Sequence, residues 1–413
     1  MIKKKVIVVG GGFAGIQIIK RLDKKLFDIL LIDKVNHHQF QPLFYQVATS
    51  QIEPASISFP LRHVVKSEKN VQVRMAEVIS VNRAKNKIST TIGELEYDYL
   101  IIAIGCKTNF FGNSEIEEHA LTLKTTYDAI KIRNHILQSF ESLICLPEKD
   151  RILNLVIVGA GPTGVELAGA FAEIKKNILP KDYPGIDFSK FNIFLIEGSN
   201  STLFSMSKTA STASMKYLAE MGVSVITETF VNSYNGSKVI LSNGKVIPTN
   251  LVIWAAGVIG NQINGFPETS YVPGNRLIVN QVSTVIGCDN IFAIGDIACM
   301  VTPKYQKGHP QVANVAITQA NLLTKNLKAI ELNKPLSEYE YRDLGSMATI
   351  GNNKAVVDLP FFKFAGHLAW FIWMFLHLML ILTIRNKIVI FSDWAWKFIT
   401  KDTSLRLILT EPK

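Results

Sequence analysis

Two glycine-rich segments have the residue types and spacing that bind the phosphates of a dinucleotide. Residues 10–15 and 159–164 both read G-x-G-x-x-G. The glycines of such a segment permit a tight turn and close approach of a pyrophosphate, and the N-terminus of the following helix attracts the phosphate charge. One copy alone is weak evidence, because glycine turns are common. The duplication favours two dinucleotide sites over two ordinary turns.

An acidic residue follows each glycine segment, at the end of the next apolar run. Asp33 ends the run at 29–32, and Glu197 ends the run at 193–196. A carboxylate at this place accepts hydrogen bonds from ribose hydroxyls. Glu197 would also repel a 2′-phosphate, and no arginine follows it directly. The sequence therefore predicts NADH rather than NADPH at the second site.

A repeated order of apolar runs and helical patterns must position these residues. Each glycine segment follows a β-branched run, at 6–9 or 155–158, and precedes a helical pattern. Further apolar runs lie at 29–32, 99–105, 193–196, 251–257 and 291–296. This order predicts an α/β protein with two Rossmann-type dinucleotide-binding domains.

Composition and charge exclude several classes of protein. The chain has 413 residues, of which 48% are hydrophobic and 19% charged, so it is folded rather than disordered. Its formal net charge is +10, which suits anionic lipid or anionic cofactors. The longest basic block is Lys3-Lys4-Lys5, so we expect no nucleic-acid partner. We also expect no signal peptide, because a strand pattern starts directly after these lysines.

The cysteines offer no redox pair and no metal site. Their positions are Cys106, Cys145, Cys288 and Cys299, with no C-x-x-C spacing. This scatter argues against a disulfide framework, a zinc site and a dithiol centre. We assign no metal, and a reducing compartment fits best.

The chain resembles the type II NADH dehydrogenases, the single-subunit NADH:quinone oxidoreductases, over nearly its whole length. The stretches that carry the resemblance are 36–48, 159–169, 292–296 and 345–351, with the tail into Ala369-Trp370. Disulfide reductases share the dinucleotide folds but need a redox cysteine pair. The resemblance implies a flavoprotein of the respiratory chain that passes hydride from NADH to FAD and then two electrons to a membrane quinone. It implies no proton pumping, because no multi-span channel is present.

The resemblance also predicts how the domains are arranged along the chain. In flavoproteins with two dinucleotide domains a late strand returns to the FAD domain, and the acid after it binds the ribityl chain. Gly295-Asp296 follows such a run. We therefore expect an FAD-binding domain from 1–115 and 270–330, an NADH-binding domain from 116–269, and a C-terminal membrane-association region from 331–413.

The same resemblance assigns the cofactor residues. Glu166 matches a family glutamate near the flavin that influences charge transfer or protonation, although a carboxylate capping the first turn of its helix is an alternative. The implied FAD residues are Gly10, Gly12, Phe13, Ala14, Gly15, Asp33, Lys34, Gln41, Gly105, Gly295 and Asp296. The implied NADH residues are Gly159, Gly161, Pro162, Thr163, Gly164, Glu197 and Gly257.

The sequence departs from the family where the quinone pocket is expected. Family members carry two glutamines four residues apart on the helix after the Gly-Asp pair, and here Asn314 and Thr318 hold those positions. Gln311 and Gln319 lie nearby but off that face. The candidate quinone residues are Gln311, Asn314, Ala316, Thr318 and Lys363. Two interpretations stay open: the quinone pocket is altered, or the protein passes its electrons to a different acceptor.

The C-terminal segment has the composition of a membrane-associating region. No formally charged residue occurs from Phe364 to Ile384, while Lys363, Arg385 and Lys387 flank this run. Such a run is long enough to span a bilayer, whereas family members lay amphipathic helices in the interface and often dimerise there. Spanning, interfacial and buried-interface arrangements stay open, and tryptophans with flanking cations favour the interfacial one. We expect a peripheral homodimer on the cytoplasmic face of the inner (plasma) membrane.

Two other functions remain open. A sulfide:quinone oxidoreductase shares the double fold and the membrane tail but needs cysteines at the flavin and a degraded nicotinamide site. The second is an NADH-binding flavoprotein with a sensing role or another acceptor. It is compatible with Asn314 and Thr318 at the two positions where the family has glutamines.

Overall fold

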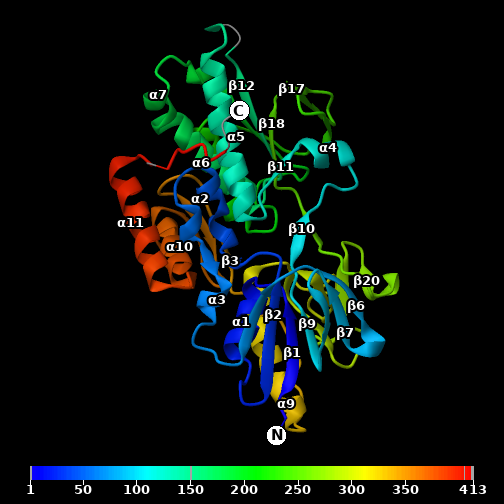
Figure 1. Ribbon diagram of the computed structural model, residues 1–413. Coiled ribbons are helices and arrows are strands. Elements are labelled where there is room, and N and C mark those ends of the chain that lie inside the picture. Colours follow the sequence, from blue (N-terminus) through cyan, green and yellow to red (C-terminus); the bar gives the residue numbers. More distant parts are fainter. Residues whose placement is uncertain (1, 149–150, 404, 411–413) are drawn as a thin grey trace. The chain divides into compact units, whose positions relative to one another are not determined.

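The computed structural model describes residues 2–148, 151–403 and 405–410 (Figure 1). The chain forms two compact units. Unit 1 comprises Met1–Gln39, Phe59–Lys107 and Val258–Asp343, and unit 2 comprises Phe40–Ser58, Thr108–Gly257 and Leu344–Lys413. Each unit contains a five-stranded parallel sheet with helices against it, which confirms the predicted α/β class with two Rossmann-type domains. The predicted FAD, NADH and membrane-association boundaries stay predictions.

Unit 1 is built on a sheet with the strand order β22-β9-β1-β2-β5. These strands are Ile291–Ala293, Tyr99–Ile102, Lys4–Val9, Phe27–Asp33 and Val71–Met75. All pairings are parallel, with Val6 opposite Ile29 in β1 and β2. The last four residues of β1 are all buried, as in a strand whose two faces are covered. Helix α1 (Phe13–Arg21) packs against β1 and against α9 (Ala313–Glu331).

Smaller elements complete unit 1. One three-stranded antiparallel sheet contains β6 (Val78–Asn82), β7 (Lys87–Thr90) and β8 (Gly93–Glu96). A second small sheet contains β20 (Tyr271–Val272), β21 (Arg276–Val279) and β23 (Ala298–Met300). Unit 1 also contains β3 (His37–Gln39), α3 (Leu61–Val64) and β19 (Val258–Gly260).

Unit 2 repeats this plan with the strand order β11-β18-β12-β13-β14. The strands are Leu121–Thr122, Leu251–Trp254, Leu153–Val158, Phe191–Ile196 and Val223–Ile226, and all pairings are parallel. Helix α5 (Thr126–Ile144) begins with a capping box between Thr125 and Asp128, which satisfies backbone N–H groups at the helix start. Helix α6 (Pro162–Asn177) is buried from Gly164 to Ile174, so it is a core helix.

The other elements of unit 2 surround this sheet. They are α2 (Phe44–Ala48), α4 (Ser114–His119), α7 (Leu179–Asp182), α8 (Lys208–Glu220), β15 (Val231–Tyr234), β16 (Lys238–Leu241) and β17 (Val246–Pro248). Helix α2 comes from the N-terminal part of the chain, yet it packs between α5 and α6. Residues 40–58 are therefore an early segment built into the second unit.

The C-terminal residues of unit 2 form a small sheet followed by two helices. The strands β24 (Ser346–Thr349), β25 (Ala355–Asp358) and β26 (Lys363–Gly366) are antiparallel. Helices α10 (His367–Leu380) and α11 (Ile384–Thr400) follow, shown in orange and red in Figure 1. The uncharged run 364–384 is thus divided among β26, α10 and the start of α11. Within the described ranges, no helix combines the length and apolarity needed to cross a membrane.

Candidate functional site

The first glycine segment is a tight turn between β1 and α1 in unit 1. Gly10 has a φ of +105°, and a Cβ there would lie 2.3 Å from the Ala103 carbonyl oxygen. A Cβ on Gly15 would lie 1.9 Å from the Gly10 oxygen, so only glycine lets the helix pack onto the turn. Gly12 has nothing within 4 Å of a Cβ. Its surroundings leave room for a phosphate to approach the helix start.

The carboxylate of Asp33 braces this turn. Its Oδ2 accepts a hydrogen bond from the Gly11 N–H at 2.5 Å, and its Oδ1 accepts one from the Val35 N–H at 2.9 Å. An ionised carboxylate has about four acceptor positions, so capacity remains for ribose hydroxyls. The neighbouring Lys34 instead forms an exposed ion pair with Glu77 at 2.6 Å.

His38 contacts this turn, and the sequence analysis did not identify it. Its Nδ1 lies 2.8 Å from the Gly11 carbonyl oxygen, and its side chain is only 1% exposed. Burial lowers the pKa of His38 to about 4, so the ring is neutral and Nδ1–H donates to Gly11. The ring also meets Phe13 edge-on, with centroids 5.2 Å apart. His38 thus holds the middle of the glycine turn from outside its βαβ unit.

Helix α9 and the residues just before it brace the Gly295-Asp296 pair. The Gly295 N–H donates to Gln319 Oε1 at 2.8 Å, and Gln311 Nε2 donates to the Asp296 carbonyl oxygen at 3.0 Å. Cys106 Sγ donates to Asp296 Oδ2 at 2.9 Å. A Cβ on Gly295, where φ is +73°, would lie 3.3 Å from the Cβ of Ala316. The structure therefore brings together two predicted flavin residues and two predicted quinone residues, Gln311 and Ala316.

Helix α9 carries short polar side chains at Asn314 and Thr318, the two positions where the sequence departs from the family that it resembles. Thr318 Oγ1 lies 2.7 Å from the Asn314 carbonyl oxygen and 2.6 Å from the Tyr339 hydroxyl. The Asn314 side chain adjoins Tyr341. Lys363, the fifth candidate, belongs to unit 2 and is exposed in β26. A threonine–tyrosine hydroxyl pair thus stands where the family resemblance led us to expect a glutamine amide.

The second glycine segment repeats the geometry of the first in unit 2. Gly159 has a φ of +97°, and a Cβ on Gly164 would lie 1.8 Å from the Gly159 carbonyl oxygen. Gly161 is open, with nothing within 4 Å of a Cβ. Glu197 Oε2 accepts from the Ala160 N–H at 2.6 Å, and Oε1 accepts from the Ser199 N–H at 2.8 Å. This is the bracing that Asp33 gives to Gly11.

The flanking residues of the second turn also fit an anion site. Pro162 opens α6, where its missing N–H costs nothing. Pro162 and Thr163 are exposed, and no side chain caps the helix. Gly257, after β18, has a φ of +74°. Two open turns, each with a helix start and a braced carboxylate, therefore fit two dinucleotides.

Glu166 is a buried acid in α6. Its Oε1 accepts a long hydrogen bond from the Thr349 N–H at 3.4 Å. The first turn of α6 contains no acidic residue, so Glu166 does not cap the helix. Burial raises the pKa of Glu166 to about 8, and the Thr349 hydrogen bond only partly offsets this. The carboxyl group is therefore mostly protonated at neutral pH and suited to donate a proton near its pKa.

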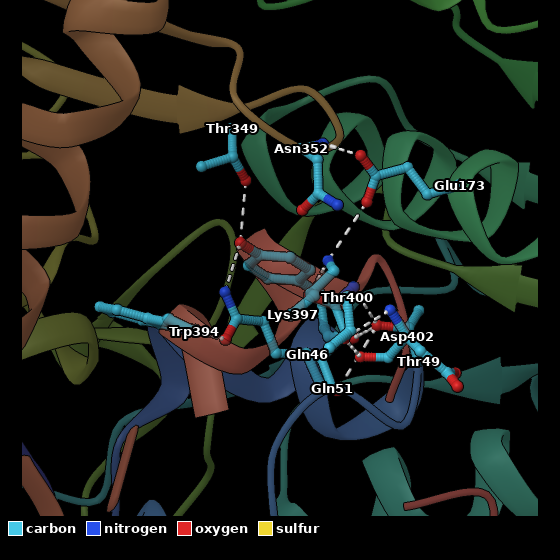
Figure 2. Close-up of polar contacts among 11 residues, drawn as sticks. Gln46, Thr49, Gln51, Glu173, Thr349, Asn352, Trp394, Lys397, Thr400 and Asp402 are labelled. Carbon is cyan, nitrogen blue, oxygen red and sulfur yellow. Dashed lines mark hydrogen bonds and ion pairs between the residues drawn. The ribbon is translucent and has the colours of Figure 1, made fainter. Parts of the chain in front are cut away.

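A polar network surrounds the cavity beside Glu166, and Figure 2 shows most of its members. The Tyr45 hydroxyl lies 2.8 Å from Thr349 Oγ1 and accepts a hydrogen bond from Gln46 Nε2 at 3.0 Å. Trp394 Nε1 donates to Gln46 Oε1 at 2.8 Å. Residues from α2, α11 and β24 thus meet around one face of α6. No spacing rule in the sequence predicted this meeting.

Known proteins share both parts of this architecture. The chain matches the pyridine nucleotide-disulphide oxidoreductase family model over residues 4–320 and the NDH2 C-terminal domain model over residues 344–401. It is 32% identical over 416 residues to the type II NADH:quinone oxidoreductase Ndh of Mycobacterium tuberculosis, covering 96% of this chain and 89% of that protein.

Two solved structures have the same fold. NDH2 from Plasmodium falciparum, in complex with NADH, has a TM-score of 0.89 at 24% identity, covering 99% of this chain and 100% of that chain. The sulfide:quinone oxidoreductase from Aquifex aeolicus has a TM-score of 0.74 at 21% identity, covering 97% and 96%. At these identities the likeness is one of fold alone.

The buried acid gives a testable dependence of stability on pH. Burial raises the pKa of native Glu166 to about 8, from an ordinary value of 4.5 for a free glutamate side chain. Wild type should therefore lose free energy of unfolding relative to Glu166→Gln as the pH rises between these values. The slope should approach about 1.4 kcal/mol per pH unit. Urea unfolding of both proteins across this range measures it. Parallel curves would mean that Glu166 is ionised when folded.

The two braced carboxylates give a paired substitution test. Glu197→Gln removes one charge-assisted acceptor and the charge that repels a 2′-phosphate, so kcat/KM for NADH should fall roughly ten-fold. The preference for NADH over NADPH should narrow. Asp33→Asn, the matched change at the other turn, should weaken FAD retention and leave the NADH preference unchanged. Steady-state kinetics and flavin content separate the two, and exchanged effects would reverse the cofactor assignment.

Proposed function

Because the chain belongs to the type II NADH:quinone oxidoreductase family, we propose that it oxidises NADH through bound FAD and passes two electrons to a membrane quinone. The observation that carries this proposal is the duplicated turn, in which a carboxylate braces an open glycine segment once in each unit. One nucleotide site alone would support a simple dehydrogenase. Two sites in one chain support a reaction between two dinucleotides.

We assign FAD to unit 1 and NADH to unit 2. Asp33 would bind the FAD ribose, while Asp296, whose Oδ2 now accepts from Cys106, would bind the ribityl chain. Glu197 would bind the ribose of NADH. When bound, FAD supplies the hydride acceptor and the two-electron donor, and the protein supplies placement and electrostatics.

The reaction requires a proton that NADH does not bring. A hydride carries two electrons and one proton, whereas reduction of a quinone to a quinol takes two electrons and two protons. Each turnover therefore takes one proton from solvent. Glu166 is a buried acid with a pKa near neutrality, so we assign it as the group that delivers this proton.

The polar groups of α9 support a quinone site of modified chemistry. Gln311 and Gln319 are engaged in holding Gly295 and Asp296. Asn314 and Thr318, with Tyr339 beside Thr318, offer an amide and hydroxyl groups to a quinone carbonyl instead of two amides. These groups retain hydrogen-bonding capacity, which supports a quinone site in spite of the departure from the family.

The C-terminal helices support a peripheral membrane position. Exposed apolar side chains recur at helical spacing on both helices, at Leu368, Phe371, Phe375 and Met379 of α10 and at Ile384, Ile388 and Phe391 of α11. Cationic residues lie next to these apolar positions in the sequence at Lys363, Arg385 and Lys387, as suits an anionic leaflet. We therefore propose a peripheral protein on the cytoplasmic face of the inner membrane. A homodimer through this region extends the same proposal.

The acceptor can be tested directly with the purified protein. NADH should reduce the bound flavin, and a soluble quinone should reoxidise it within the turnover time, while dioxygen alone should do so far more slowly. Stopped-flow absorbance follows the two half-reactions separately. A flavin that NADH reduces but quinone fails to reoxidise would identify a different acceptor or a sensing role.

The membrane face can be tested without truncation. Phe371→Glu with Phe375→Glu should lower binding to anionic vesicles by about ten-fold or more, because burying each Phe is worth roughly 1.5–3 kcal/mol. The matched control is Phe204→Glu, at an aromatic side chain that is 71% exposed elsewhere in unit 2. Vesicle co-sedimentation measures binding, and flavin reduction by NADH reports folding. Undiminished binding by the double variant would place the membrane contact elsewhere.

A further inference from the structure

A buried ion pair lies on the same helix face as Glu166. Lys397 Nζ of α11 is 3.2 Å from Glu173 Oε2 of α6, and the two side chains are only 12% and 10% exposed. Lys397 Nζ also donates to Gln51 Oε1 at 2.7 Å (Figure 2). The other Glu173 oxygen, Oε1, accepts from the Asn352 N–H. Because burying two charges is costly, a buried ion pair need not stabilise the fold. A role other than stability is therefore worth examining for this pair.

The pair is aligned with Glu166 by helix geometry. Glu166 and Glu173 are two turns apart on α6, which places them on one face about 10 Å apart along the axis. Ala170 lies between them, and its small side chain leaves that face open. All three residues line the same cavity. The acid and the ion pair therefore face one internal space.

The ion pair separates two small cavities. The inner one is lined by Tyr45, Glu166 and Trp373, and the outer one by Asn177, Lys401 and Thr403. Gln51, Glu173, Asn352 and Lys397 line both. Lys401 is exposed and Asn177 is partly exposed, so the outer cavity adjoins the protein surface. The ion pair therefore borders both the outer cavity and the cavity that holds the buried acid.

The size of the cavities decides what they hold. The volume that the centre of a water molecule can occupy is about 20 Å³ in the inner cavity and about 10 Å³ in the outer one. That is room for about one ordered water in each and too little for a quinone ring. Trp373 lines the inner space, and its Nε1 is buried without a hydrogen-bond partner among the described residues. A water there would satisfy this donor.

We propose that Lys397, held by Glu173, relays protons from solvent through the two water sites to Glu166. The proposal rests on the proposed quinone reduction, which consumes one solvent proton per NADH. Glu166 loses its carboxyl proton to the reduced acceptor. An ammonium proton of Lys397 then crosses the inner water to the Glu166 carboxylate, and the resulting amine takes a proton from solvent through the outer water. No electrons move in these steps, and one proton enters for each one delivered.

The electrostatic surroundings suit this role. The titratable side chains that line the inner cavity with Glu166 are Tyr45 of α2, Glu173 of α6 itself and Lys397 of α11. β24 carries no titratable side chain, and the charged side chains of α7 and α8 are absent from the cavity lining. Burial raises the pKa of Glu173, and Lys397 opposes that rise. Lys397 thus favours the charged form of Glu173.

The test follows flavin reoxidation in the full-length, FAD-loaded protein. Lys397→Met should slow reoxidation by a soluble quinone by roughly ten-fold or more, increasingly as the pH rises, and should enlarge the solvent isotope effect. Reduction by NADH should not change. Reoxidation by ferricyanide, which takes electrons without protons, should also not change. Lys397→Arg keeps the ion pair but cannot release a proton, so it should be slow as well.

Control variants separate the relay from packing. Lys354→Met breaks an ion pair with Glu220 of 2.8 Å in the same unit, with side chains 32% and 44% exposed, and should match wild type. Glu173→Gln combined with Lys397→Met leaves no unpaired buried charge, and it should be as slow with quinone as Lys397→Met alone. This double variant keeps the test valid if Lys397→Met folds poorly.

Several results would overturn the relay. Wild-type rates in Lys397→Met, or in a folded double variant, would remove Lys397 from the proton path. Full activity of Lys397→Arg would show that only the charge matters, and equal slowing with ferricyanide would show a general disturbance. Failure of the proposed function has a separate signature, because wild type itself would then show no reoxidation by quinone, and the relay would fall with it.

Discussion

The hydrogen bonds from the middle of each glycine turn to the acid of the next strand organise this protein. Asp33 holds Gly11 and Glu197 holds Ala160, so one carboxylate fixes the turn, the start of the helix and the end of the second strand. A cofactor ribose would then meet an acceptor that is already oriented. The shape of each site is therefore set before a dinucleotide binds, which lowers the entropy lost on binding.

Local spacing explains which parts of the site could be predicted from the sequence. The glycine turns, Asp33 and Glu197 follow from one βαβ pattern, and the α/β class follows from its duplication. His38 and Gln319 brace the turns across 27 and 24 positions, and Lys397 meets Glu173 across 224. Such contacts depend on tertiary packing rather than on periodicity. The glutamines beside Asn314 and Thr318 were visible in the sequence, but their bonds to the Gly295-Asp296 backbone were not.

The second unit is assembled from three distant parts of the chain around α6. Residues 40–58 supply α2, the middle of the chain supplies the sheet, and the C-terminus supplies β24, α10 and α11. Their polar groups converge where Tyr45, Thr349 and Glu166 meet. A neutral buried acid needs this shell, because without it water would reach the carboxyl group and return its pKa toward the ordinary value.

The close approach of Gly169 to Gly351 fixes how the C-terminal helices are mounted. A Cβ on Gly169 would lie 2.6 Å from the Gly351 nitrogen, Trp373 and Trp394 are buried, and Asn386 bonds to the Ala55 and Ser56 carbonyl oxygens. The apolar face of α10 and α11 is thus the outer surface of a packed core and no detachable tail. Cutting the chain before these helices would expose the core of unit 2, whereas replacing their outer side chains would leave that core covered.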